Sequence, residues 1–314
     1  MISVLYLTRQ CPNSCTYCAI RSSPLQEREL STDEWLDAFD ILEDLGVEFH
    51  LILGNEPLMR TDIVELVSYL TNVKKVPYGL YTTCPPGLMF DRAQPLIDIG
   101  ITNVSCGFDV IPNTGPKYMR DKAGTGIEGL IWFRDQGVRD LHASVTMSNI
   151  NLYDLGKIVR YLSRRGIWAG LNPIHWNKDG KYDFFPLRSH IDHLIPAKED
   201  IELGIGKLLG ELEQTDMLHN PQQFLAEWPQ YYDMNWHCNK PLIYTVDADG
   251  HMRCCGYRKG DECPNITIFD LVNGSSYWER WHVDQKNCPG CYWSCPWQAE
   301  HWKDNMDAIK YHKE

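Results

Sequence analysis

Short apolar runs rich in β-branched and aromatic residues alternate with amphipathic stretches from the N-terminus to about residue 175. The six runs predicted to be strands are Ser3–Thr8, Phe49–Leu53, Tyr78–Thr83, Asn103–Phe108, His142–Met147 and Trp168–Pro173. The helical stretches between them are Thr32–Leu45, Thr61–Leu70, Asp91–Ile99, Gly124–Gln136 and Leu152–Arg165. Repeated βα units of this kind predict an α/β fold with a parallel sheet and helices outside it.

The strands are apolar on both faces, which suits either a parallel barrel or an open doubly wound sheet, and periodicity does not choose between them. In parallel barrels the chemistry lies at the carboxyl ends of the strands. Here the segment Cys11–Cys18 directly follows the first predicted strand, and Gly54–Pro57 directly follows the second. Both unusual segments are therefore expected on the same rim.

The second half of the chain has a weaker pattern. We predict a barrel over residues 1–200 and a connector over 201–237, with a helix at Lys198–Gln214. Residues 238–314 are rich in Cys, Trp and Gly and lack the apolar mass of an independent core, which is the situation in which a bound metal centre supplies stability. Within them, Val246–Gly250 is typical of a hairpin turn.

Charge and hydropathy exclude some classes of protein. The 314-residue chain has a net charge of −12, which disfavours an unspecific grip on nucleic acid. No run of about 18 apolar residues predicts a membrane span, and the N-terminus lacks the basic and small-residue features of a secretion signal. We therefore expect a cytoplasmic protein.

Cysteine is abundant, with 12 residues in the chain. A reducing cytosol disfavours a disulfide framework, so ligation of a metal or a cluster is the leading interpretation. Three cysteines lie within Cys11–Cys18 and seven between Cys238 and Cys295. The other two, Cys84 and Cys106, fall at the ends of predicted strands, where buried structural thiols are favoured over a role at the rim.

Cys11, Cys15 and Cys18 form a CxxxCxxC pattern on a loop, with Tyr17 before the last cysteine. Three thiolates can hold three corners of a cubane cluster and leave the fourth iron open. A zinc knuckle is the alternative. The motif resembles the defining motif of radical SAM enzymes. That resemblance implies a [4Fe-4S] cluster whose open iron chelates the amino and carboxylate groups of S-adenosylmethionine, and an aromatic ring at Tyr17 against the adenine.

The segment Gly54, Asn55, Glu56 and Pro57 is similar to the GGEP segment of the same family, whose backbone and acid bind the methionine amine. Asn55 stands where that motif has its second glycine, which changes the local backbone freedom.

Two further segments, Val104–Asp109 and Val145–Asn151, resemble the family more loosely. They make Arg120, Ser148 and Asn149 candidates for binding the ribose or the methionine carboxylate, with a strand end or a helix cap as the alternative.

The C-terminal cysteines resemble the twitch or SPASM-type extensions found behind radical SAM barrels. That resemblance implies one auxiliary [4Fe-4S] cluster, with ligands among Cys238, Cys255, Cys288, Cys291 and Cys295. The choice between Cys254 and Cys255 is open, and a zinc ribbon is the alternative. If the reaction is an epimerisation, the resemblance makes Cys84, Cys106 and Cys254 candidate hydrogen-atom donors.

Over nearly the whole chain, the resemblance implies a partial (β/α)6 TIM-like barrel that cleaves S-adenosylmethionine to a 5′-deoxyadenosyl radical. The radical would abstract hydrogen from, or add to, an organic substrate, with an electron donor such as flavodoxin or ferredoxin. Oxidation, epimerisation and carbon–carbon bond formation all stay open. The short length outside the barrel favours a small-molecule substrate over a peptide. A structural zinc protein and a redox-sensing regulator are the rival interpretations.

Overall fold

One twisted sheet organises the chain in the computed structural model, which describes residues 1–18, 28–112, 123–176, 188–233, 235–237, 243–253 and 266–273. The strands are β1 (Ile2–Tyr6), β2 (Phe49–Leu53), β3 (Tyr78–Tyr81), β4 (Asn103–Gly107), β5 (Asp140–Met147), β6 (Trp168–Pro173), β7 (Ile243–Val246) and β8 (Met252–Arg253). Their order across the sheet is β6-β5-β4-β3-β2-β1-β7-β8. All neighbours pair in parallel except β7 and β8, which are antiparallel.

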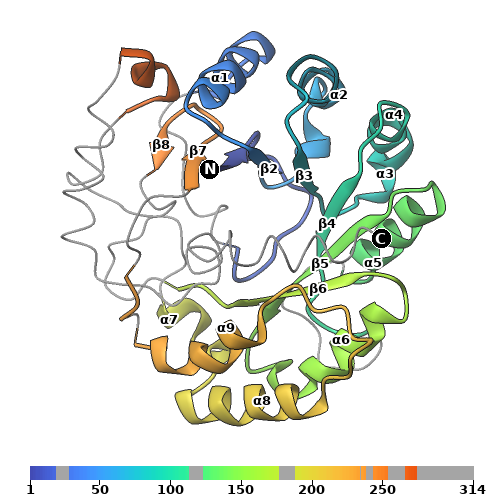
Figure 1. Cartoon of the computed structure of the whole chain (residues 1–314), viewed down its shortest axis with the longest axis vertical. Coiled ribbons are helices and arrows are strands. Elements are labelled where there is room, and N and C mark those ends of the chain that lie inside the picture. Colours follow the sequence, from blue (N-terminus) through green and yellow to red (C-terminus); the bar gives the residue numbers. More distant parts are fainter. Residues whose placement is uncertain are drawn as a thin grey trace.

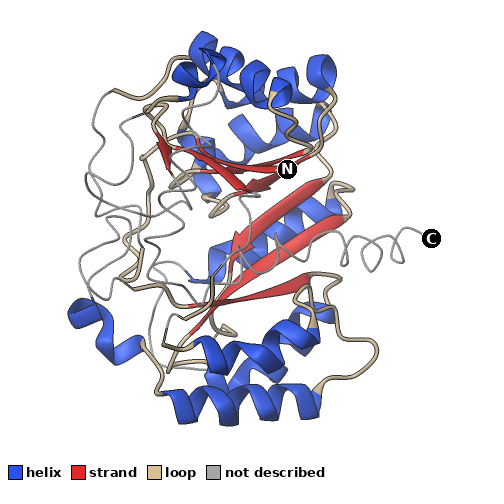
Figure 2. Cartoon of the chain, turned by 60° about the vertical axis from the view of Figure 1, so that its left-hand side comes forward, coloured by secondary structure: helices blue, strands red, loops and turns tan. Residues whose placement is uncertain are grey.

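One or more helices follow each of β1 to β6 along the chain. They are α1 (Thr32–Asp44), α2 (Ile63–Ser68), α3 (Pro86–Leu88), α4 (Gln94–Asp98), α5 (Ala123–Asp135), α6 (Leu155–Ser163), α7 (Arg188–Ile191), α8 (Lys198–Glu211) and α9 (Gln222–Glu227). Shorter 3₁₀ or π turns occupy Pro57–Met59, Tyr69–Lys74, Met89–Ala93, Leu152–Asp154, Asp192–Leu194, Trp228–Tyr231 and Ile268–Asn273. The helices lie along the outside of the curved sheet (Figures 1 and 2).

The predicted α/β fold is confirmed, and it is a partial barrel. Each of the six predicted strands is present, and the strand bounds differ from the predicted ones by at most two residues. A helix also starts at Lys198, as the sequence indicated. The barrel strands match the sequence closely because each combines a short apolar run with a glycine or polar boundary.

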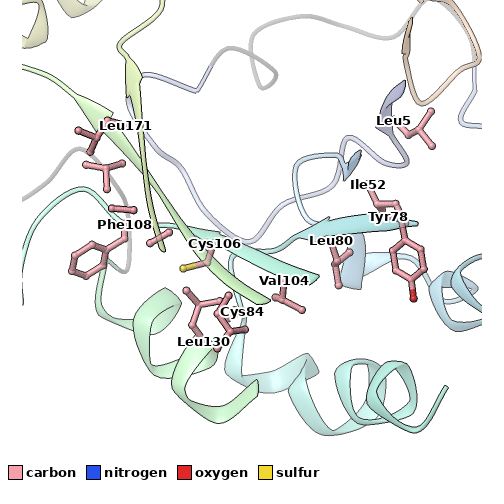
Figure 3. Close-up of a cluster of buried hydrophobic side chains, with 14 of the residues drawn as sticks. Leu5, Ile52, Tyr78, Leu80, Cys84, Val104, Cys106, Phe108, Leu130 and Leu171 are labelled. Atoms are coloured by element: carbon pink, nitrogen blue, oxygen red, sulfur yellow. The ribbon is translucent and has the colours of Figure 1, made fainter. Parts of the chain in front are cut away.

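Local chemistry explains where the first helix begins. The hydroxyl of Ser31 accepts from the Glu34 backbone N–H, and the Glu34 carboxylate accepts from the Ser31 N–H, which forms a capping box. The helix buries Trp35, Ala38, Phe39 and Leu42 against the sheet. Figure 3 shows part of this layer between sheet and helices, including Leu80, Val104 and Leu130.

The segment predicted to begin the C-terminal extension continues the barrel sheet. β7 pairs in parallel with β1, from Ile243 opposite Ile2 to Val246 opposite Leu5. The predicted turn follows it, with the Gly250 N–H donating to the Asp247 carbonyl at 2.9 Å and Gly250 at a φ of 84°. A left-handed residue at this position favours glycine. This part of residues 238–314 therefore shares the barrel's hydrogen bonding.

The predicted connector also packs on the barrel. Gly204 of α8 lies so close to Leu152 that an added Cβ would sit 2.5 Å from the Leu152 side chain. Beyond α8, the His219 N–H donates to the Ala169 carbonyl, and the Asn220 side chain hydrogen-bonds both backbone groups of Leu171. Residues 217–220 thus cover the edge of β6, whose backbone groups would otherwise lack partners.

Within the described ranges, we find no helix with the length and apolar character needed to cross a membrane.

Candidate active site at the barrel rim

Two loops meet at the carboxyl ends of β1 and β2. The Asn55 N–H donates to the Thr8 carbonyl at 3.0 Å, and the Glu56 N–H donates to the Gln10 carbonyl at 2.9 Å. These bonds hold the segment after β2 against the segment that leads into Cys11. The structure therefore brings together the two motifs that the sequence predicted to share a rim.

Gly54 makes this close approach possible. It has a φ of 138°, a conformation that L residues with a side chain rarely adopt. A Cβ at this position would lie 2.8 Å from the Thr8 carbonyl oxygen and 3.0 Å from the Thr8 nitrogen. The glycine is thus required both by its backbone angle and by the space available.

The three cysteines of the loop are half-buried, and none of them is joined in a disulfide. The pKa of Cys11 is raised to about 11, mainly by burial and to a smaller extent by the negative charges of Glu56, Cys15 and Cys18, against one backbone hydrogen bond from Asn13. Three thiolates here need a cationic partner, because their charges repel one another at short range. Across the ranges that the structure describes, no three His, Cys, Asp or Glu side chains are grouped around a single-ion position.

Glu56 is fully buried behind this loop. Its Oε1 accepts from the Leu58 N–H at 3.0 Å and the Thr82 hydroxyl at 2.7 Å, and its Oε2 accepts from the Thr83 N–H at 2.5 Å and the Thr83 hydroxyl at 2.6 Å. Burial raises the pKa of Glu56, and these four donors oppose that rise. The carboxylate thus joins the end of β2 to the end of β3.

The side chain of Asn55 has one satisfied end and one unsatisfied end. Its Nδ2 donates to the Arg9 carbonyl, which adds a side-chain link to the two backbone links between the loops. Its Oδ1 is buried and has no hydrogen-bond partner among the described residues. Buried acceptors are almost always hydrogen-bonded, to protein, to water or to a ligand. Pro57, which follows Glu56, is buried and begins a helical turn.

Tyr17 is held across the mouth of the barrel. Its hydroxyl donates to Oδ2 of Asp109 at 2.7 Å, and the other oxygen of Asp109 accepts from the Thr146 N–H at 2.9 Å. The Asn151 side chain in turn donates to the carbonyls of Asp109 and Thr146. This network anchors the cysteine loop to the ends of β4 and β5 and fixes the position of the Tyr17 ring.

Ser148 and Asn149 lie after β5 and have local structural partners. The Ser148 N–H donates to the Asn151 side chain, and its hydroxyl accepts from the Ile150 N–H. Asn149 is exposed, and its Nδ2 donates to the carbonyls of His193 and Ile195. These contacts match the alternative in which both residues shape the end of a strand, and we propose no ligand contact for them. Arg120 lies outside the described residues.

Cys84 and Cys106 lie in the layer between the sheet and α5 (Figure 3). A Cβ on Gly129 would lie 2.2 Å from the Cys84 Cβ, and one on Gly126 would lie 3.0 Å from the Cys106 sulfur. Burial raises the pKa of Cys84 well above its usual value. Both thiols pack as structural residues, so we propose neither as a hydrogen-atom donor.

The C-terminal candidates lie outside the described residues. They are the hydrogen-donor candidate Cys254 and the predicted auxiliary ligands Cys238, Cys255, Cys288, Cys291 and Cys295. Their roles stay predictions.

A buried ion pair joins the cysteine loop to the turn after β7. The Arg9 Nε donates to Oδ1 of Asp247 at 2.8 Å, while its terminal nitrogen pairs with Oδ2. The Arg9 side chain is 10% exposed and that of Asp247 is 0% exposed. Sequence reasoning missed this pair because its members are 238 positions apart and neither belongs to a motif.

Replacing Asp247 with Asn should lower the free energy of unfolding by about 2 kcal/mol, because the Arg9 charge loses its buried partner while one acceptor is kept. Urea unfolding of the purified protein measures the change. Asp154→Asn is the matched control, since Asp154 pairs with Lys157 at the surface and should change stability by less than about 0.5 kcal/mol. Equal midpoints for the two variants would contradict a structural role for the Arg9 pair.

The sequence matches the family model described as the Radical SAM superfamily over residues 5–162. That stretch covers half of the chain and contains the end of β1, the cysteine loop, the Gly54–Pro57 segment and β2 to β5. The chain therefore belongs to the radical SAM superfamily.

Curated relatives and solved structures are consistent with this. The PqqA peptide cyclase of Rhodopseudomonas palustris is 41% identical over 112 residues, which are 33% of this chain and 28% of the relative. A probable GTP 3′,8-cyclase of Methanococcus maripaludis is 25% identical over 262 residues, 80% of this chain and 83% of the relative. The crystal structure of Streptococcus suis SuiB shares the fold, with a TM-score of 0.61 at 12% identity over 95% of this chain and 66% of that one.

The aligned region is only part of most of these relatives. Five curated relatives, four PqqA peptide cyclases and an Fe-coproporphyrin III synthase, are matched over 26% to 57% of their own length.

Proposed function

We propose that the protein is an enzyme that reductively cleaves S-adenosylmethionine at a [4Fe-4S] cluster held by Cys11, Cys15 and Cys18. The observation that carries the proposal is the contact between the cysteine loop and the Gly54–Pro57 segment, which brings three thiols near a buried acceptor that has no donor among the described residues. These residues fit the cofactors, because the thiols can ligate iron and the acceptor can receive a ligand's hydrogen bond.

The bound cluster and S-adenosylmethionine would supply a 5′-deoxyadenosyl radical for hydrogen abstraction or addition. The chain's own residues do the positioning. Tyr17, tied to Asp109, holds an aromatic ring at the barrel mouth where an adenine can lie against it. Glu56 locks the loop after β2 to the end of β3, so the rim is rigid before a ligand arrives.

Peptide modification is the first candidate for the reaction. The most identical stretch reported above belongs to a PqqA peptide cyclase, and three further relatives carry the same description. A small-molecule substrate is the second candidate, because the match to a GTP 3′,8-cyclase spans far more of both chains. Cell extract is separated by size into a fraction of peptides and a fraction of smaller molecules, and each is added to the enzyme separately. The fraction that increases 5′-deoxyadenosine release indicates which class of substrate the enzyme uses.

The activity itself is tested by anaerobic incubation with dithionite and S-adenosylmethionine. Release of 5′-deoxyadenosine by the wild type, and none by the variant with Cys11, Cys15 and Cys18 all changed to Ala, is the expected result. If the wild type holds iron but releases no 5′-deoxyadenosine, the protein is better interpreted as a redox regulator. A colourless, zinc-loaded protein would indicate a structural zinc protein.

We also propose one auxiliary [4Fe-4S] cluster on the C-terminal cysteines. The spacing of these cysteines supports it. Iron analysis should find about eight irons per chain in the wild type and about four after Cys288 and Cys291 are changed to Ala.

A further inference from the structure

We propose that the side-chain oxygen of Asn55 accepts a hydrogen bond from the ammonium group of bound S-adenosylmethionine. The inference rests on the proposed function and assigns a ligand contact to a side chain that the GGEP motif does not have. Glycine at this position offers only its backbone, whereas Asn55 adds a carboxamide to the rim.

The orientation of the carboxamide is determined by its other end. Nδ2 donates to the Arg9 carbonyl, and a rotation of the amide by 180° would place two oxygens against each other. Oδ1 is therefore directed away from Arg9. It is buried and lacks a donor among the residues that the structure describes. A buried acceptor without a donor is costly, which favours a partner that arrives with a ligand.

Glu56, the residue that the family resemblance assigns to the amine, is already occupied. Each of its oxygens accepts two hydrogen bonds, from Leu58 and Thr82 on one side and from two groups of Thr83 on the other. A carboxylate has about four acceptor positions in total, and all four are filled. An incoming ammonium would have to displace one of these donors in the protein interior.

The location of Asn55 agrees with a contact to the amine. Its backbone bonds to Thr8, and the next residue bonds to Gln10, which directly precedes Cys11. The oxygen therefore lies on the segment packed against the first cluster ligand. An ammonium group has three donors and no acceptor, which matches an oxygen that can only accept.

Binding of two ligands to the reconstituted full-length protein tests the assignment. Equilibrium dialysis under anaerobic conditions measures the Kd of S-adenosylmethionine and of its desamino analogue for the wild type, Asn55→Gly and Asn55→Asp. We expect Asn55→Gly to weaken S-adenosylmethionine binding about tenfold and to leave the analogue unchanged. Asn55→Asp keeps an acceptor and adds a charge, so its preference for S-adenosylmethionine over the analogue should equal or exceed that of the wild type.

The two variants also separate the ligand contact from the link to Arg9. Both variants lose the Nδ2 donor to Arg9. If Asn55 served only that link, the ratio of the Kd of S-adenosylmethionine to the Kd of its desamino analogue would be the same in both variants as in the wild type. This result would overturn the assignment. Iron and sulfide content are measured on each sample. If Asn55→Gly loses its cluster, the comparison with the wild type is made with Asn55→Asp alone. A wild type that binds neither ligand would overturn the proposed function as well.

Discussion

Changing Glu56 to Gln should lower the free energy of unfolding by about 3 kcal/mol or more. An amide of the same shape replaces one acceptor oxygen with an NH2 group, which must then face donors from Leu58 and Thr82 or from Thr83. The Leu58 and Thr83 backbone N–H groups cannot reverse their roles, so at least one buried donor is left unpaired. Urea unfolding followed by circular dichroism measures the loss.

Glu65→Gln is the matched control for this change. Glu65 is exposed on α2, and its replacement should alter stability by less than about 0.5 kcal/mol. If Glu56→Gln were as stable as that control, the buried carboxylate would not be the link between β2 and β3 that its hydrogen bonds indicate.

Changing Gly54 to Ala should cost about 3 kcal/mol and should reduce the iron content of reconstituted protein. The new Cβ would meet the Thr8 backbone at 2.8 Å, and the φ of 138° is strained for alanine. Relief requires the loop after β2 to move away from the loop that carries Cys11. Iron and sulfide per chain, with the urea midpoint, measure the two effects.

Gly206→Ala in α8 provides the comparison for the glycine change. Nothing lies within 4 Å of the added Cβ at Gly206, and alanine favours a helix over glycine by roughly 1 kcal/mol. This variant should be as stable as the wild type or more so, with unchanged iron. A Gly54→Ala protein with full iron and a wild-type midpoint would show that the two loops need no close approach.

The barrel and the location of the site could be predicted from the sequence because their signals are local. Each strand is a continuous apolar run, and the order of strand, loop and helix places Cys11 and Gly54 on one rim. Gly54, the first residue of the Gly54–Pro57 segment, has a φ of 138°, an angle that glycine adopts more readily than other residues.

Other features could not be predicted from the sequence, because they depend on contacts between residues far apart in the chain. Tyr17 and Asp109 are 92 positions apart, and nothing in either segment indicates the partner. The orientation of Cys84 and Cys106 could not be predicted either, since strands apolar on both faces do not reveal which face meets the helices. The role of Glu56 was assigned from a motif, whereas its four donors come from the turn that follows it and the end of a neighbouring strand.

The pairing of β1 with β7 affects the order in which the protein can assemble during synthesis. β1 is made long before β7, so one of its two edges lacks its partner strand until Ile243–Val246 has been made, and the pair between Arg9 and Asp247 forms only after that. Until Asp247 has been made, a nascent chain therefore carries an open strand edge and a cysteine loop that is held by its contacts with Asn55, Glu56 and Asp109 without the pair to Asp247. Stable insertion of iron at that loop is expected only after the chain has passed Asp247.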